Sequence, residues 1–166
     1  MPQLQKAPVM AYVALGANLG EAQQTVLRAF DALALLPGTQ LTARSSLYRT
    51  VPHEALGPDF VNAVAEIATR LSAPDLLDAL LSLEHQAGRL RPYSHAPRTL
   101  DLDLLFYGDA RVQSPRLTLP HPRWTERAFV LVPLADVCPS LVAQELLAAV
   151  ADQQIERFSQ PDSLTG

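Results

Sequence analysis

The sequence is poor in cysteine, in long apolar runs and in positive charge, and each shortage excludes a class of protein. The single cysteine among 166 residues, Cys138, excludes an internal disulfide framework and a zinc site built from several cysteines. No segment approaches the roughly 20 apolar residues that a membrane-spanning helix needs. The short apolar run from Val9 to Leu15 has no convincing signal-peptide cleavage site and favours a strand. We therefore expect a soluble, cytoplasmic protein that does not contact a membrane.

The shortage of positive charge argues against a nucleic-acid partner. The chain has 13 Lys and Arg against 17 Asp and Glu, a formal net charge of −4. Proteins that bind nucleic acid normally present a basic face, so we expect no nucleic-acid partner. The sequence contains no Gly-x-x-x-x-Gly-Lys-Ser/Thr segment, which excludes a P-loop as a nucleotide holder. His53, His85 and His95 show no metal-ligand spacing, so no zinc site is expected.

What the sequence does contain is enough apolar material for one core. Hydrophobic residues make up 48% of the chain, a share typical of globular proteins. A length of 166 residues suits one compact domain. We expect a single domain over residues 1–166, with an ordered core at about 9–158 and a loose leader and tail.

Hydrophobic periodicity predicts alternating strands and helices. Strands are expected at Met10–Leu15, Leu41–Tyr48, Phe60–Thr69 and Thr99–Phe106, and helices at Glu21–Leu36 and between Ser72 and Gly88. This order, β-α-β-β-α-β, is that of an α+β, ferredoxin-like core: an antiparallel sheet with helices on one face. The last third adds a C-terminal extension, with a Pro-bounded loop and one or two short helices.

The two helices have identifiable ends and inner faces. Ser72 followed by Asp75 resembles a capping box, and Gly88 is a natural stop for the second helix. Residues at helical spacing are expected to face the sheet. They are Val26, Phe30, Leu33 and Pro37 in the first helix, and Leu76, Leu80, Leu83 and Ala87 in the second.

Two aspartates alternate with leucines in the segment Leu100–Phe106. In a strand, Asp101 and Asp103 project from one face, with Cα atoms about 6.6 Å apart, while Leu102 points the other way. Neighbouring carboxylates repel each other and lose hydration, so a cation is expected to offset them. Magnesium prefers oxygen ligands and is typically held by one or two carboxylates together with substrate phosphates. The alternative is a solvent-facing strand on which both aspartates are simply hydrated.

Three arginines, Arg89, Arg91 and Arg98, precede this strand. Their guanidinium groups match phosphate oxygens. The alternative is ion pairing with Glu84 or with the aspartates. His121, held between two prolines with Arg116 and Arg127 nearby, is open to either a structural role or a phosphate contact.

Two phenylalanines are each open to two structural roles. Phe60 and Phe129 pack in the core, or they sandwich a flat heterocycle by offset stacking. Asn62 would share the face of Phe60 and offers both a donor and an acceptor to the edge of such a ring.

Taken together, these motifs resemble the 6-hydroxymethyl-7,8-dihydropterin pyrophosphokinases. The resemblance covers residues of about 10–142, and the run Pro97–Asp103 is its most specific part. The other matching segments are Tyr12–Gly20, Ser46–Thr50, Phe60–Ala63, Leu83–Arg89 and Leu119–Phe129. Departures occur at Tyr93–Ala96, where the family often carries a basic residue and a tryptophan, and at Pro122, where an aromatic is frequent. Tyr93 or His95 is therefore left open as the residue that seals the loop.

The resemblance implies a magnesium-dependent transferase of folate biosynthesis. Such an enzyme transfers pyrophosphate from ATP to 6-hydroxymethyl-7,8-dihydropterin and releases AMP. Two magnesium ions on Asp101 and Asp103 are implied, with Arg89 and Arg98 as further catalytic residues. The implied ATP-binding residues are Arg89, Arg91, Arg98, Leu104, Arg116, Thr118, His121 and Arg127. The implied pterin-binding residues are Thr50, Val51, Phe60, Asn62, Asp101 and Phe129.

Some questions stay open from the sequence. The general base for the pterin hydroxyl is either Asp103 or a metal-bound hydroxide, and we expect a monomer. The rival functions are a different metal-dependent phosphotransferase or nucleotide hydrolase, and a small-molecule-binding regulatory module.

Overall fold

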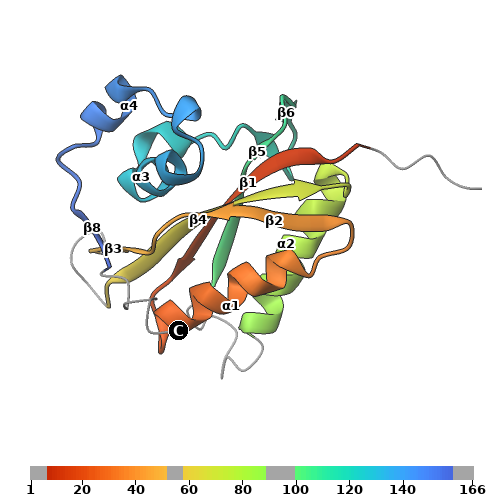
Figure 1. Cartoon of the computed structure of the whole chain (residues 1–166), viewed down its shortest axis with the longest axis horizontal. Helices are drawn as coiled ribbons and strands as arrows, with labels where there is room; N and C mark the ends of the chain where they lie inside the picture. The colour runs from red at the N-terminus through yellow and green to blue at the C-terminus, as the bar shows by residue number, and fades with distance from the viewer. Residues whose placement is uncertain (1–6, 52–57, 89–99, 159–166) are drawn as a thin grey trace, which may run out of the picture.

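An antiparallel sheet forms the centre of the molecule. The computed structural model describes residues 7–51, 58–88 and 100–158, and its main sheet has the strand order β5-β1-β4-β3-β8, with β2 also paired to β4 (Figure 1). The strands are β1 (Val9–Ala17), β2 (Thr39–Arg44), β3 (Tyr48–Thr50), β4 (Phe60–Thr69), β5 (Asp101–Tyr107) and β8 (Ile155–Arg157). β6 (Val112–Gln113) and β7 (Thr118–Leu119) form a separate small pair. The ferredoxin-like prediction is confirmed.

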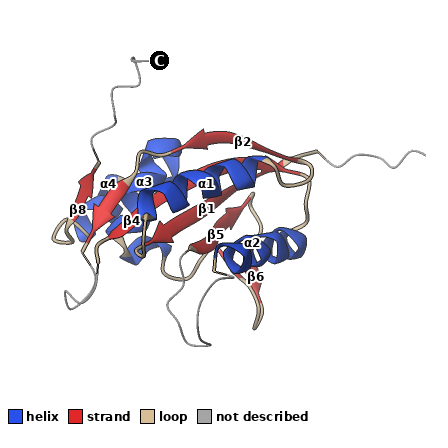
Figure 2. Ribbon diagram, turned by 90° about the horizontal axis from the view of Figure 1, so that it is seen from below, coloured by secondary structure: helices blue, strands red, loops and turns tan. Residues whose placement is uncertain are grey.

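Helices α1 (Ala22–Ala34) and α2 (Ala73–Ala87) cover one face of the sheet (Figure 2). Their apolar side chains, among them Phe30 and Leu80, pack against the alternate residues of β1, β4 and β5. Ser72 accepts a hydrogen bond from the backbone N–H of Asp75, so the predicted cap is confirmed. The predictions for Pro37 and Ala87 are wrong: both are exposed, since each lies at or beyond the last residue of its helix.

The opposite face of the sheet is also covered, which corrects the expectation of helices on one face. Helix α3 (Ala128–Val137) packs there with Leu131 and Leu134 fully buried against Ala14 and Val64. The sheet has apolar residues on both sides, and an open apolar face of this size would be exposed to water without the extension. The short helices η2 (Trp124–Glu126), η3 (Pro139–Leu141) and α4 (Gln144–Ala149) complete this layer.

The second predicted strand is divided in two. Between β2 and β3, Ser45 donates its backbone N–H to the carbonyl of Val64 at 2.9 Å, and its hydroxyl accepts the N–H of Val64. Beyond the break, Asp136 of α3 accepts hydrogen bonds from the Tyr48 hydroxyl at 2.6 Å and from the Ser46 N–H at 3.2 Å. Strand β3 is therefore fastened to α3 as well as to β4.

Strand β8, which pairs with β3, is an element that the sequence did not predict. Its three residues are too few for a recognisable alternation. The expectation of a single domain stays a prediction.

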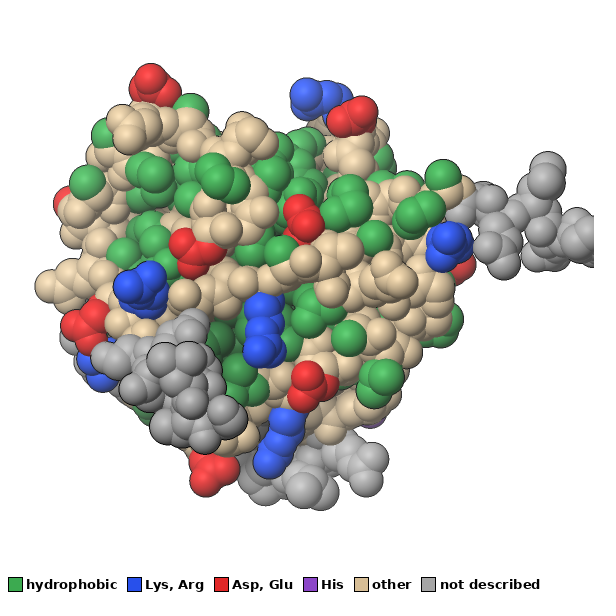
Figure 3. Space-filling view, viewed as in Figure 1, with side chains coloured by type: hydrophobic (Ala, Val, Ile, Leu, Met, Phe, Trp, Pro, Cys, Tyr) green, Lys and Arg blue, Asp and Glu red, His purple; other side chains and the backbone are tan. Residues whose placement is uncertain are grey.

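Two observations on the described residues concern a membrane span and the distribution of charge. In the described ranges, no helix combines the length and the apolar character needed to cross a bilayer. On the face shown in Figure 3, acidic and basic side chains are interspersed among apolar and polar ones.

Leu80 and Leu81 provide a test of the core between α2 and the sheet. Leu80 is fully buried, whereas its neighbour Leu81 is 47% exposed. Leu80→Ala should lower the free energy of unfolding by about 2–5 kcal/mol, because it removes buried contacts and leaves a cavity. Leu81→Ala should cost less than about 1 kcal/mol. Urea denaturation of both variants measures the difference, and equal losses would contradict the packing of α2 described here.

Candidate active site

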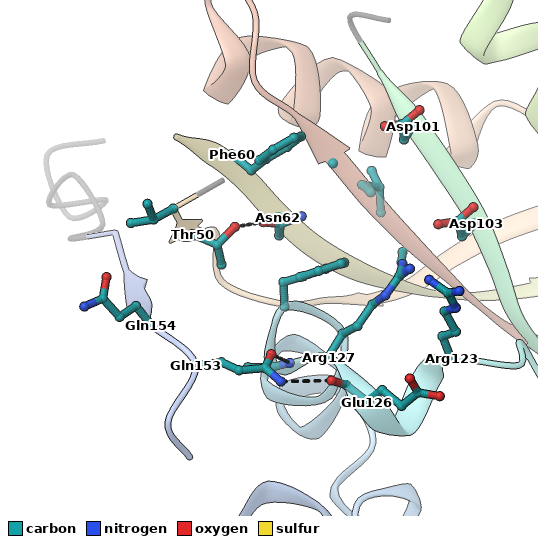
Figure 4. Close-up of a pocket in the computed structure, with 16 residues that line it drawn as sticks. Thr50, Phe60, Asn62, Asp101, Asp103, Arg123, Glu126, Arg127, Gln153 and Gln154 are labelled. Carbon is teal, nitrogen blue, oxygen red and sulfur yellow. Dashed lines mark hydrogen bonds between the residues drawn. The ribbon is translucent and has the colours of Figure 1, made fainter. Parts of the chain in front are cut away.

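A cavity of about 940 Å³ lies between the α3 face of the sheet and the N-terminus of α3 (Figure 4). Six parts of the chain form its wall: the ends of β1 and β3, the starts of β4 and β5, the η2–α3 junction, and the segment before β8. The lining residues are Ala14, Leu15, Gly16, Thr50, Val51, Phe60, Asn62, Asp101, Asp103, Arg123, Glu126, Arg127, Ala128, Phe129, Gln153 and Gln154.

Strand register places the polar residues of the floor in one row. Gly16 in β1 is paired with Asn62 in β4 on one side and with Asp101 in β5 on the other. Residues paired across antiparallel strands point to the same face, so Asn62 and Asp101 face the cavity across Gly16. A Cβ atom added at Gly16 would lie 3.1 Å from Nδ2 of Asn62. A glycine is therefore what leaves room between the amide and the carboxylate.

The two aspartates project together from β5, as predicted. Asp101 and Asp103 are exposed, and Leu102 and Leu104 are buried on the opposite face. The backbone N–H of Leu102 donates a 2.6 Å hydrogen bond to a carboxylate oxygen of Glu84 in α2. This bond ties the outer edge of β5 to α2 midway between the two aspartates.

The carboxylates of Asp101 and Asp103 suit a metal ion that binds together with a substrate. Within the described residues, no group of three or more His, Cys, Asp or Glu side chains could hold a metal ion by itself. Magnesium commonly takes one or two protein carboxylates and completes its shell with water and phosphate oxygens. Two exposed carboxylates on one face fit that ion better than a structural metal.

At the other end of the cavity, polar groups are ordered by one hydrogen bond. The Thr50 hydroxyl donates to Oδ1 of Asn62 at 2.7 Å, and both residues are buried. The acceptor of the Asn62 amide is thus engaged, while its amino group faces the Gly16 side of the floor. Phe60 and Phe129 are half-buried and line the cavity, so neither is an ordinary core residue. The Arg127 guanidinium lies 5.3 Å from the centre of the Phe129 ring, a cation–π contact.

His121 lies near Asp103 but is not among the residues that line the cavity. Its backbone N–H donates to the carbonyl of Leu105 at 2.9 Å, and its Nδ1 accepts from the N–H of Arg123 at 3.2 Å. Burial lowers the pKa of its imidazole below the ordinary 6.5, and the charges of Arg127 and Arg123 act in the same direction while Asp103 opposes them. Its surroundings therefore favour the neutral imidazole.

Several predicted residues lie elsewhere. Arg116 forms an exposed ion pair with Asp78 of α2. The Leu104 side chain is in the core between the sheet and the two helices, so it is not available to a ligand. Thr118 is in β7 and does not line the cavity. Arg89, Arg91 and Arg98, together with Tyr93 and His95, lie outside the described residues.

Sequence reasoning missed Arg123, Glu126, Gln153 and Gln154 as lining residues. Arg123 precedes η2 and Glu126 is its last residue. Their closeness in sequence to His121 and Arg127 was the available signal. Gln153 and Gln154 follow α4 and belong to no motif. Only the tertiary structure brings these two residues to the cavity wall.

Comparison with known proteins gives a consistent result. The family model for 7,8-dihydro-6-hydroxymethylpterin-pyrophosphokinase matches residues 12–139. A Pseudomonas aeruginosa protein named 2-amino-4-hydroxy-6-hydroxymethyldihydropteridine pyrophosphokinase is 47% identical over 154 residues, covering 89% of this chain and 95% of the relative. A Haemophilus influenzae protein of the same name is 44% identical over 161 residues, covering 91% and 99%.

Solved structures support the fold. A Plasmodium falciparum HPPK-DHPS triple mutant with STZ-DHP superposes with a TM-score of 0.66 at 14% identity, over 84% of this chain and 41% of that one. The crystal structure of an HPPK-DHPS in complex with substrates gives 0.66 at 12% identity, over 89% and 43%. This chain thus spans less than half the length of each of these two-part proteins.

The surroundings of His121 predict the direction in which its pKa is shifted. Its pKa, followed by NMR of the imidazole, should lie below 6.5. Asp103→Asn should lower it further, because that carboxylate is the group that favours the imidazolium form. Since the folded-state pKa is lowered, His121 should destabilise the fold as the pH falls through its unfolded-state pKa. A rise of the pKa in Asp103→Asn would contradict the proximity of the two groups.

Proposed function

The chain belongs to the 7,8-dihydro-6-hydroxymethylpterin-pyrophosphokinase family, and on that premise we propose that it transfers pyrophosphate from ATP to 6-hydroxymethyl-7,8-dihydropterin in folate biosynthesis. The observation that carries the proposal is the row Asn62–Gly16–Asp101. This row places the Asn62 amide and the aspartate pair on the same face of the sheet, within one cavity. The amide can hydrogen-bond to the edge of a pterin ring, and the carboxylates can bind the cations that accompany the phosphate chain of ATP.

The pterin occupies the part of the cavity lined by Thr50, Phe60, Asn62 and Phe129, which we name the pterin slot. The two half-buried phenyl rings offer faces to a flat bicycle. The fused pyrimidine ring of a pterin carries donors and acceptors along one edge, and the Asn62 amide has an amino group to offer there. The hydrogen bond from Thr50 orients this amide and prevents it from rotating. Val51, 47% exposed beside Thr50, borders the slot and contributes its backbone.

ATP is placed at the aspartate end. Asp101 and Asp103 would hold two magnesium ions, which supply neutralisation of the phosphate charge and a fixed orientation for the phosphates. Asp101 lies nearest to Asn62 in the row and also borders the pterin. Arg127 reaches the same cavity and offers a guanidinium to phosphate oxygens.

Other groups complete the nucleotide site. The imidazole of His121 lies beside Asp103. Because its Nδ1 accepts the N–H of Arg123, its neutral form carries the proton on Nε2 and can donate one hydrogen bond without adding charge. Arg89, Arg91 and Arg98 are proposed to complete the phosphate contacts, with Arg116, Thr118 and the Leu104 backbone toward the nucleoside.

The chemistry needs little beyond position and charge. The hydroxymethyl oxygen of the pterin attacks the β-phosphorus of ATP, forming an O–P bond. The bond from that phosphorus to the oxygen shared with the α-phosphate breaks, and AMP leaves. The hydroxyl proton passes to Asp103 or to water. Arginine side chains would balance the charge that shifts onto the AMP oxygen, and cations held by Asp101 and Asp103 would supply further neutralisation.

The rival functions use the same groups differently. A nucleotide hydrolase would need the carboxylates but not the pterin slot, and a regulatory module would need the slot but no turnover. The joint presence of slot and carboxylate pair supports a two-substrate transfer. We further propose that the protein acts as a cytoplasmic monomer, without membrane or nucleic acid.

Product identification tests the proposal. Incubation of the protein with ATP, magnesium and 6-hydroxymethyl-7,8-dihydropterin should yield AMP and the pterin pyrophosphate in equal amounts. Omission of the pterin should reduce AMP formation to background, and EDTA should abolish the transfer until magnesium is restored. Formation of ADP, or AMP release at a similar rate without pterin, would refute the assigned reaction.

The aspartate pair can be tested by neutral isosteres. Asp101→Asn and Asp103→Asn should each lower kcat on the order of a thousandfold, because metal-held phosphate charge is no longer compensated. Pterin affinity, measured by fluorescence titration, should fall far less than the rate. Asp109→Asn, at an exposed turn after β5, is the matched control and should keep full activity. Retention of turnover in both site variants would place the metal elsewhere.

A further inference from the structure

Gln153 contacts the backbone on both sides of Arg127, although it is 25 residues away from Ala128 in sequence. Its Oε1 accepts the backbone N–H of Ala128 at 2.8 Å, and its Nε2 donates to the carbonyl of Glu126 at 2.9 Å (Figure 4). Both bonds come from one planar amide. The pair therefore fixes the position and the direction of the peptide segment between them.

The residue type is the one this arrangement requires. A carboxamide carries one acceptor and one donor group side by side, whereas a carboxylate has acceptors only. Helix α3 begins at Ala128 with a free N–H to satisfy, as every helix does in its first turn. Its N-cap residue, Arg127, makes no side-chain capping bond. Gln153 supplies that cap from a distant segment.

What the amide holds is part of the cavity wall. Arg127 has an extended backbone, with φ −128° and ψ 120°, and its guanidinium stacks over the Phe129 ring. Both side chains line the cavity. Displacement of the peptide at 126–128 would move the phosphate-facing guanidinium and the pterin-facing ring together.

The same segment is anchored at the other wall of the slot. Ile155, two residues after Gln153, is the pairing partner of Thr50 in the β3–β8 ladder. Thr50 in turn holds Asn62. Two extended residues span at most about 7 Å, so residues 153–155 cannot lengthen. They join the N-terminus of α3 to β3 by a short connection, which we name the C-terminal strap.

We propose that Gln153 is a positioning residue for the pterin slot. Through its two backbone hydrogen bonds it holds Arg127 and Phe129 in place, and through the C-terminal strap it sets their distance from Thr50 and Asn62. The amide acts through these residues and does not itself contact the reacting atoms. This inference rests on the proposed function, since the slot is defined by its pterin.

The test compares Gln153→Glu, Gln153→Ala and the unmodified protein. Glutamate keeps the length and the acceptor but cannot donate to the Glu126 carbonyl, so both variants should bind the pterin roughly 3- to 10-fold more weakly. KM for the pterin should rise by a similar factor. Asp152→Asn, an exposed neighbour that does not line the main cavity, should bind as the unmodified protein does.

The readouts separate positioning from general stability. Pterin Kd is measured by fluorescence titration well below the unfolding midpoint of each variant, and the midpoint itself by calorimetry. If Gln153→Glu binds pterin more weakly while still fully folded at the assay temperature, the result supports positioning through both hydrogen bonds of the Gln153 amide. If the unmodified protein binds pterin and Gln153→Glu binds it within twofold as tightly, the inference is wrong and the proposed function stands. If the unmodified protein binds no pterin, the proposed function itself is wrong.

Discussion

The register of β1 between β4 and β5 is the constraint on which the rest of the site depends. It pairs Gly16 with Asn62 on one side and with Asp101 on the other. A shift by one residue would turn either partner to the opposite face, because side chains alternate along a strand. The burial of β1 on both faces opposes such a shift, since a one-residue slip would exchange the residues that pack in the two cores. Core packing and substrate geometry are thus secured by the same pairing.

The two faces of the sheet carry different tasks. On one face, α1 and α2 pack in the cluster that buries Leu102 and Leu104 of β5, and Glu84 of α2 accepts a hydrogen bond from the backbone between the aspartates. On the other face, α3 packs far enough along β4 to bury Val64 but leaves the row of Asn62 and Asp101 uncovered. The cavity lies over the part of the second face that the body of α3 leaves open, and Ala128 and Phe129 at the start of α3 line its wall. A sheet covered on one side alone would have the floor but no opposing ring from Phe129.

Long-range polar contacts hold the elements around this cavity. Asp136 fastens β3 to α3 through the Tyr48 hydroxyl, and burial together with this hydrogen bond raises the pKa of the Tyr48 phenol above its ordinary value. Gln153 fastens the start of α3 from the other side. A slot for a flat ring tolerates little variation in width, because stacking contacts weaken steeply as the rings separate. Hydrogen bonds between segments far apart in sequence therefore accompany the aromatic side chains.

The sequence alone determined those features that depend on local periodicity: the boundaries of β4, the cap of α2 at Ser72, and the projection of Asp101 and Asp103 from one face of their strand. Strands repeat every two residues and helices every 3.6, so both patterns involve only residues close in sequence and can be recognised without knowledge of the fold. The motif resemblance also identified the family. Only the tertiary structure decided that Gly16 separates Asn62 from Asp101, that α3 covers the second face, and that Gln153 belongs to the wall. These relations are set by strand register and by contacts across 25 or more residues, and no local pattern encodes them.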